Sequence, residues 1–147
     1  MEQRFDLSKV TPAGFRAVFG LEKYVQGALD HTVLHLIKVR ASMVNGCAFC
    51  MDMHTTDALK EGESSQRLFG LAAWRESSFY DDRERAALAL TDVVTHIGPH
   101  GVPDEVWDDV VEQFGEEGAA NVLLAIGTIN LWNRLTITSR KQPVPAA

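Results

Sequence analysis

The only two cysteines of this 147-residue chain, Cys47 and Cys50, stand three positions apart, and His54 follows one helical turn later. On an α-helix, residues three and four positions apart share a face, so both thiols and the imidazole would lie together. The Cα atoms of the two cysteines would then be about 5 Å apart, which is within the range of a disulfide. Asn45-Gly46 precedes the pair as a break and would place Cys47 in a first helical turn, where free N–H groups lower a thiol pKa. A dithiol beside a base is a redox constellation.

The rest of the chain is expected to be helical nearly throughout, because apolar residues recur every three or four positions. Pro12 opens the first helix and Gly27 ends it, and Asp30 caps a second helix that lasts to the break at Asn45-Gly46. Further helices are expected from Gly46 or Cys47 to about Lys60, over 66–73, over 81–94, from Pro103 to about Phe114, and over 117–138, with a loop over 96–101. Alternation typical of strands is absent. The sequence therefore predicts one all-α domain over residues 1–147, with six to eight helices and a frayed tail over 141–147.

Composition excludes several classes of function. The chain has 14 Lys and Arg against 20 Asp and Glu, a net charge of −6, which argues against a nucleic acid partner and against an anionic membrane surface. The first residues are charged where a secretory signal would be apolar, and the apolar stretch 119–132 is too short and too polar to span a bilayer. We therefore expect a cytoplasmic protein, in which a cysteine pair is more often catalytic or metal-binding than a structural disulfide.

Residues 31–59, and above all the run Lys38 to Thr55, resemble the core of the carboxymuconolactone decarboxylase/alkylhydroperoxidase D superfamily. The segment Ile129 to Leu135 resembles the closing helix of small proteins in that group. The resemblance implies an all-helical fold, a homotrimer or homohexamer, and thiol-dependent reduction of hydroperoxides in antioxidant defence. It also implies an external reductant of the lipoyl or thioredoxin type, and no bound cofactor. The nearly all-apolar helix over 119–132 independently favours a subunit interface.

The resemblance also assigns roles to the residues of the motif. Cys50 corresponds to the peroxidatic cysteine, Cys47 to the resolving cysteine and His54 to the proton-relay histidine. The family pattern has a glutamate twelve residues before the first cysteine, where this chain has His35. A histidine that often stands between the two cysteines is replaced by Phe49. His35 is therefore a candidate relay residue without the negative charge of the glutamate.

Three other interpretations of these residues stay open. Cys47, Cys50 and His54 supply three ligands that zinc accepts, and His35 could be the fourth, as in a zinc- or redox-sensing module without turnover. A lyase acting on a small lactone acid would instead need a basic pocket, with Lys38 or Arg40 as candidates. The two cysteines could also be small buried core residues.

Overall fold

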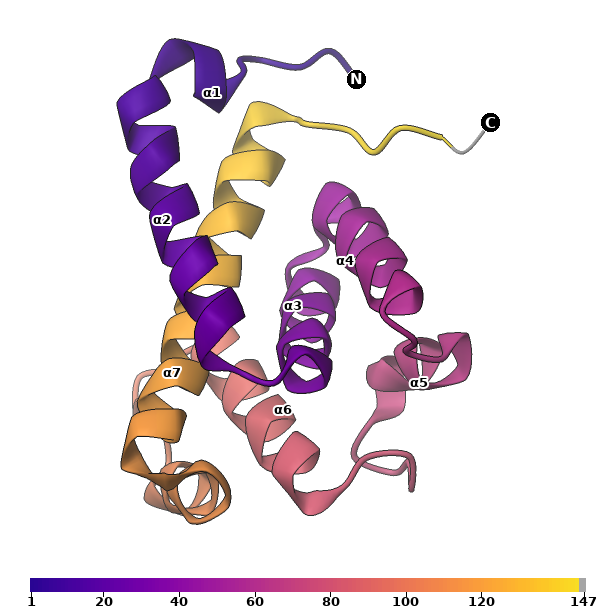
Figure 1. Cartoon of the computed structure of the whole chain (residues 1–147), viewed down its shortest axis with the longest axis vertical. Helices are drawn as coiled ribbons and strands as arrows, with labels where there is room; N and C mark the ends of the chain where they lie inside the picture. Colours follow the sequence, from indigo (N-terminus) through magenta and orange to yellow (C-terminus); the bar gives the residue numbers. More distant parts are fainter. Residues whose placement is uncertain (146–147) are drawn as a thin grey trace.

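The computed structural model describes residues 1–145 and consists of seven α-helices and one short 3-10 helix (Figure 1). The elements are α1 (Leu7–Val10), α2 (Pro12–Ala28), α3 (His31–Asn45), α4 (Ala48–Lys60), α5 (Ser65–Gly70), η1 (Leu71–Ala73), α6 (Asp82–Thr95) and α7 (Asp104–Ser139). Within residues 1–145 no strand forms, and an isolated bridge between Gly98 and Gly101 closes the loop after α6. The all-α prediction is confirmed.

Local sequence signals account for several helix boundaries. The Asp30 carboxylate accepts a hydrogen bond from the Val33 amide at 3.2 Å and so begins α3 as predicted. Asp81 and Glu84 form a reciprocal capping box at the start of α6. Gly46 ends α3 in the left-handed region, with φ 67° and ψ 34°, a conformation that glycine adopts at little cost.

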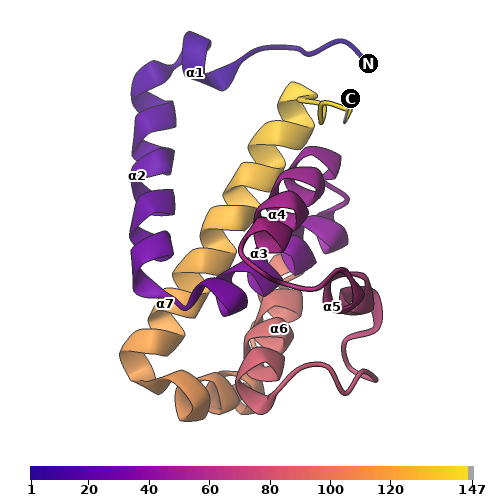
Figure 2. The same cartoon turned by 45° about the vertical axis from the view of Figure 1, so that its right-hand side comes forward.

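Helix α3 lies at the centre of the molecule and contacts α4, α6 and α7. Its apolar face, which includes Ile37, packs into the larger core cluster with Leu90 of α6 and Ile126 of α7. A second cluster, which includes Leu36, Leu71 and Trp74, fills the space beneath α5 and η1. Figure 2 shows that α2 and α7 run along the side of the α3–α4 pair, and α2 also contacts α7. The α3–α4 pair, which carries the two cysteines, is thus flanked by helices from both ends of the chain.

Helix α7 combines the two helices expected after Pro103. It is interrupted at Gly115, where φ is 71° and ψ is 170°, so the chain bends near the predicted break. One side of its apolar segment is buried, whereas Leu123, Leu124 and Leu131 on the other side are about two-fifths exposed. The apolar character of this helix is therefore only partly explained by the core of one chain.

The N-terminal segment and the end of α7 lie at the same end of the molecule (Figure 1). The Arg4 amide donates to the Ser139 carbonyl at 2.8 Å, which ties the N-terminal segment to the end of α7. Residues 141–145 adopt no helix, as expected for the tail, and Ala146 and Ala147 lie outside the described residues. None of the helices in the described part of the chain is long and apolar enough to cross a membrane.

Candidate active site

The turn between α3 and α4 sets the position of Cys47. The Cys47 amide donates to the Ser42 carbonyl at 2.9 Å, which closes the turn around Gly46. Helix α4 begins at Ala48, just after the two predicted starts, Gly46 and Cys47, because Cys47 is its N-cap, with φ −87° and ψ 94°. The Cys47 thiol therefore lies at the positive end of α4, and Cys50 lies within the first turn. Both side chains are 1% exposed and both are free thiols.

Polar side chains of α7 line the opposite side of this turn. The Thr136 hydroxyl lies 3.0 Å from the Cys47 sulfur and 3.5 Å from the Cys50 sulfur. The Asn45 amide donates to the side-chain oxygens of Asn130 and Asn133, each at 2.9 Å. Since these asparagines are buried in α7, the hydrogen bonds fix the turn against the helix.

The two thiols differ in acidity. Hydrogen bonds from the Cys50 thiol and from the Thr136 hydroxyl lower the pKa of Cys47 to about 6, although burial opposes this shift. The pKa of Cys50 is raised, because its thiol is the partner of the Cys47 sulfur and because it is buried. At neutral pH the pair therefore holds its negative charge on Cys47 and its proton on Cys50.

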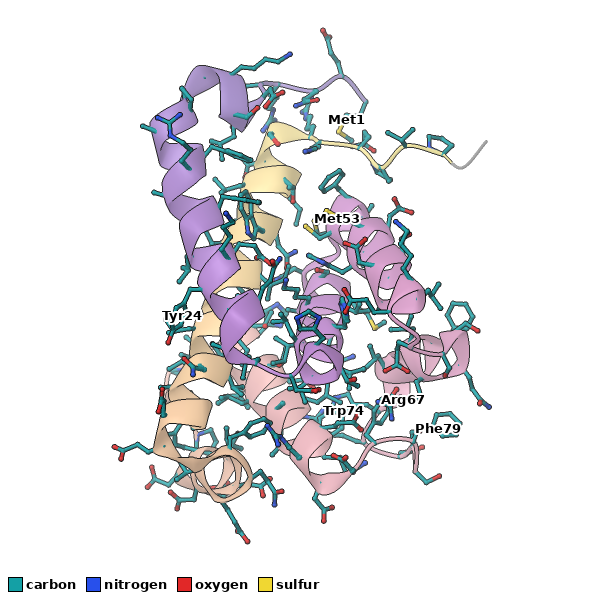
Figure 3. All side chains as sticks on the ribbon, in the orientation of Figure 1. Met1, Tyr24, Met53, Arg67, Trp74 and Phe79 are labelled. Atoms are coloured by element: carbon teal, nitrogen blue, oxygen red, sulfur yellow. The ribbon has the colours of Figure 1, made fainter. Side chains whose placement is uncertain are left out.

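A cavity of about 420 Å³ opens beside Cys50 and does not reach Cys47. Its apolar wall comes from α2, α3, α4 and α7 and comprises Phe15, Phe19, Leu34, Phe49, Met53 and Trp132. Figure 3 labels Met53 on α4. The Phe15 ring packs edge-on against the Trp132 indole, with centroids 5.8 Å apart. Cys50 is thus the thiol that a small molecule in this cavity can meet.

His54 lines the same cavity as Cys50. Its side chain is 6% exposed, and its Nε2 atom finds no hydrogen-bond partner among residues 1–145. Burial, followed by the nearby positive charge of Lys38, lowers the pKa of His54 to about 4. The imidazole is therefore neutral near pH 7 and can accept a proton.

A buried ion pair between Glu22 of α2 and Lys38 of α3 forms another part of the wall. Glu22 also accepts hydrogen bonds from Gln26 at 2.9 Å and from the Trp132 indole at 3.2 Å. Its negative charge acts to raise the pKa of His54. Sequence reasoning missed Glu22, although a glutamate on the apolar stripe that includes Val25 was an available signal.

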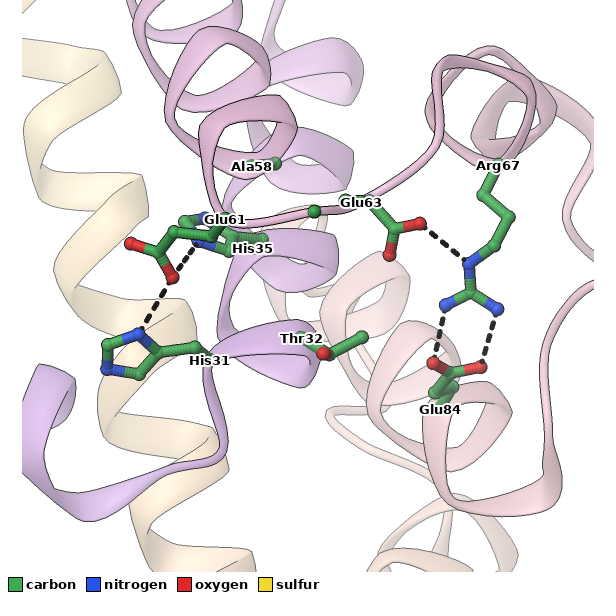
Figure 4. Close-up of a pocket in the computed structure, with 9 residues that line it drawn as sticks. His31, Thr32, His35, Ala58, Glu61, Glu63, Arg67 and Glu84 are labelled. Atoms are coloured by element: carbon green, nitrogen blue, oxygen red, sulfur yellow. Dashed lines mark hydrogen bonds and ion pairs between the residues drawn. The ribbon is translucent and has the colours of Figure 1, made fainter.

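His35 lines the cavity and forms its hydrogen bond with Glu61, which lines the cavity as well. Its Nε2 atom lies 3.0 Å from Glu61, and the same carboxylate oxygen lies 2.8 Å from Nδ1 of His31. Figure 4 shows both histidines directed at Glu61, on the wall of a neighbouring polar cavity of about 330 Å³. In that cavity Arg67 pairs with Glu63 and Glu84. His35 therefore has a carboxylate partner, Glu61, that the sequence did not identify.

The structure also places the residues of the zinc and lyase interpretations. In residues 1–145 no group of three or more His, Cys, Asp or Glu side chains is arranged to hold a metal ion, so the zinc set of Cys47, Cys50, His54 and His35 is not assembled. Arg40 pairs with Asp92 and is not part of either cavity wall.

Comparison with known proteins places this geometry in a family. The sequence model of the carboxymuconolactone decarboxylase family matches residues 11–93. The uncharacterized protein YdfG of Bacillus subtilis is 44% identical over 138 residues, which cover 93% of this chain and 94% of YdfG. The uncharacterized protein YnjA of Escherichia coli is 28% identical over 70% of this chain and 56% of YnjA.

Solved structures with the same fold support this family assignment. A protein of unknown function from Agrobacterium tumefaciens, suggested to be an antioxidant defence protein AhpD, superimposes with a TM-score of 0.94 and 41% identity, over 99% of this chain and 100% of that one. The debrominase Bmp8 shares the fold with a TM-score of 0.77 and 22% identity, over 87% of this chain and 69% of its own. The chain belongs to the carboxymuconolactone decarboxylase family and has an AhpD-like fold.

Proposed function

We propose that the chain is a thiol-dependent peroxidase that reduces organic hydroperoxides through a dithiol and disulfide cycle of Cys47 and Cys50. The observation that carries this proposal is the position of Cys50. Its thiol lines an apolar cavity together with a neutral, unpartnered imidazole, while a second thiol lies directly behind it. The suggested antioxidant role of the related Agrobacterium protein supports the same assignment.

In the first step Cys50 attacks the terminal oxygen of the hydroperoxide. His54 accepts the thiol proton, directly or through one water, and returns it to the departing alkoxide, so the products are an alcohol and a sulfenic acid on Cys50. A well-placed base of this kind contributes roughly 10²–10⁴-fold to the rate. Glu22 supplies the negative charge that the family glutamate would have provided at position 35. His35 also lines the cavity, and its imidazole is hydrogen-bonded to Glu61.

In the second step the Cys47 thiolate attacks the sulfenic sulfur of Cys50 and forms the disulfide, and the departing hydroxide takes up a proton from solvent and leaves as water. An external dithiol of the lipoyl or thioredoxin type then restores both thiols. Neither step calls for a bound cofactor.

Cys50→Ser is the decisive variant. We expect it to abolish turnover of cumene hydroperoxide with dithiothreitol, whereas Cys47→Ser should still form one sulfenic acid per chain and then stop. Peroxide consumption and mass spectrometry of Cys50 measure the two outcomes. Met51→Leu is a matched control on the same helix and should keep the wild-type rate. If Cys50→Ser turned over at the wild-type rate, the proposal would be wrong.

Two other activities can be tested with the same variants. A lactone-acid lyase would keep its activity without either cysteine, but Lys38, its candidate in the cavity, is already neutralised by Glu22. Bmp8 has been crystallised with 2,3,4-tribromopyrrole, and the aromatic wall beside Cys50 makes a halogenated pyrrole a reasonable alternative substrate. Debromination of this compound faster than peroxide reduction would favour that activity.

We also propose that the chain acts in the cytoplasm as a homotrimer or homohexamer. The exposed side of α7, with Leu123, Leu124 and Leu131, is a suitable subunit contact because apolar patches of this kind are costly in water. Multi-angle light scattering would measure the assembly, and a monomer at micromolar concentration would contradict it.

A further inference from the structure

The Thr136 hydroxyl of α7 lies within hydrogen-bond distance of both sulfur atoms, and the Asn133 side chain of the same helix also acts to lower the pKa of both thiols. The hydroxyl lies 3.0 Å from Cys47 and 3.5 Å from Cys50, and its residue is 8% exposed. Thr136 stands at the edge of the cavity, whose lining includes Thr136 and Cys50 but not Cys47. The hydroxyl thus lies at the boundary between the thiol that faces the cavity and the thiol that is enclosed behind it.

A single hydroxyl proton allows two arrangements. In one, Thr136 donates to the Trp132 carbonyl, 2.8 Å away, and accepts a hydrogen bond from a Cys47 thiol. In the other, Thr136 turns its proton to a Cys47 thiolate. The Trp132 carbonyl keeps its partner in both cases, because the backbone amide four residues later bonds to it inside α7. Thr136 can therefore stabilise the charged sulfur without leaving a buried carbonyl unpaired.

The N-terminus of α4 acts in the same direction. Cys47 is the N-cap of α4, and the backbone amide of Cys50 acts with the Thr136 hydroxyl to lower the pKa of the Cys47 thiol. Cys50 lies further along the helix and points into the cavity wall with His54. The two sulfurs of a Cys47–Cys50 disulfide would then differ both in access and in their ability to leave as a thiolate.

We propose that Thr136 is a positioning residue that holds Cys47 as the leaving thiolate, so that an external thiol reduces the disulfide by attacking Cys50. The proposal rests on the dithiol cycle described above. In this arrangement the reductant enters through the substrate cavity and forms its mixed disulfide with Cys50 and not with Cys47.

The atoms and electrons of this step balance. The thiolate of the reductant forms a bond to the Cys50 sulfur, the Cys47–Cys50 bond breaks, and its electron pair remains on Cys47, which Thr136 and the helix end stabilise. The second thiolate of the dithiol then attacks the reductant's first sulfur, which is bonded to Cys50 in the mixed disulfide. Cys50 departs, takes up a proton from solvent or from His54, and the reductant leaves as a cyclic disulfide.

The charged groups near the pair do not duplicate the role of Thr136. Those that line the cavity beside Cys50 are Glu22 from α2, His31, His35 and Lys38 from α3, His54, Asp57 and Lys60 from α4, Glu61 after α4, and Lys141 after α7. The groups that lower the pKa of Cys47 are Cys50, Thr136 and Asn133, of which Cys50 alone titrates. Thr136→Val therefore removes a hydroxyl while it leaves every titrating neighbour in place.

The first experiment identifies the sulfur that is attacked. The oxidised wild-type protein is treated with glutathione, quenched in acid and digested, and the adduct is located by mass spectrometry. We expect the glutathione on Cys50, and an adduct on Cys47 would overturn the proposal. The measurement needs no peroxide, so it is independent of the peroxidase activity that Cys50→Ser tests.

The second experiment measures what Thr136 contributes. A hydrogen bond to a charged group corresponds to about one to two pKa units, so Thr136→Val should raise the first thiol pKa, read from thiolate ultraviolet absorbance, by that amount. The same change should slow reduction of the disulfide by dithiothreitol about 3- to 10-fold. Thr136→Ser keeps a hydroxyl and should restore both values. An unchanged titration in Thr136→Val, or equal losses in Thr136→Val and Thr136→Ser, would refute the role of the hydroxyl.

Discussion

His54 and His31 show how two positions of one small protein shift the same side chain in opposite directions. His54 is 6% exposed, has an unpartnered Nε2 and sits beside a lysine, and its pKa falls to about 4. His31 has a side chain that is 58% exposed, and its hydrogen bond to Glu61 raises its pKa. Burial without a partner favours the neutral base, whereas a carboxylate partner favours the cation. The first environment therefore keeps the imidazole neutral near pH 7, and the second favours its protonated form.

The difference extends to the charges around each histidine. Beside His54, the side chains of Glu22 and Lys38 are 8% and 5% exposed, so each depends on the other for neutralisation. Beside His31, the Glu61 side chain is 46% exposed and water screens its charge. We therefore expect large effects from changes around His54 and small effects around His31.

Lys38→Met should have the largest effect on stability. Met has nearly the shape of Lys without the charge, so this change leaves the Glu22 carboxylate buried and unpaired. Removing one partner of a buried ion pair costs about 3–5 kcal/mol. Urea denaturation at pH 7 measures the free energy of unfolding.

The double variant Glu22→Gln/Lys38→Met is the control for Lys38→Met. It removes both charges, and we expect most of the lost stability to return. The two pKa effects also have defined signs: the pKa of His54 should rise in Lys38→Met and fall further in Glu22→Gln. An unfolding free energy of Lys38→Met equal to that of the wild type would show that the pair is not needed for stability.

The pH dependence of stability should show the second largest effect. Below pH 6.5 the unfolded chain protonates His54, whereas the folded chain does so only near pH 4. The unfolded state thus binds more protons in this window, so His54 lowers the stability as the pH falls from 6.5 to 4. The loss amounts to about 3 kcal/mol at the acid end.

His54→Gln isolates this term because it keeps a polar side chain that does not titrate. The stability of the wild type relative to His54→Gln should decrease as the pH falls from 7.5 to 4.5, and it should be constant above pH 7.5. Urea denaturation at each pH gives both values. A difference that stayed the same over the whole range would mean that the pKa of His54 is not lowered in the folded chain.

Much of the fold could be predicted because its boundaries depend on local chemistry. Asp30 and Gly46 act on the residues next to them, and helical periodicity is a property of each segment. Cys47 was the exception, since whether the N-cap or the first turn falls at Cys47 depends on how the turn packs against Ser42. The nearly all-apolar helix over 119–132 did predict a subunit interface, but which side of α7 stays exposed depends on how much of the helix α3 and α6 cover.

The candidate site divides in the same way. Cys50 and His54 were found because one helix positions both of them, and Cys47 is only one residue outside it. Glu22 and Thr136 were not found, because α2 and α7 bring them to the motif from 28 residues before and 86 residues after Cys50. Long-range packing decides such contacts, and neither residue carries a local motif.

His31→Asn should have the smallest effect, and its sign should be opposite to that of His54. The raised pKa of His31 means that the folded chain binds its proton more tightly, so the contribution to stability is present below pH 6.5 and is lost as the pH rises through the folded pKa. Wild type and His31→Asn should therefore have the same unfolding free energy at pH 8.5 and differ slightly at pH 5.5, with the wild type more stable. The difference should shrink in high salt, because the pair with Glu61 is exposed.

His100→Asn serves as the control, because His100 is an exposed histidine in the loop after α6 and is not paired with a carboxylate as His31 is. A larger effect of His31→Asn at pH 8.5 than at pH 5.5 would contradict the assignment, because a raised pKa cannot stabilise the folded chain where the imidazole is neutral.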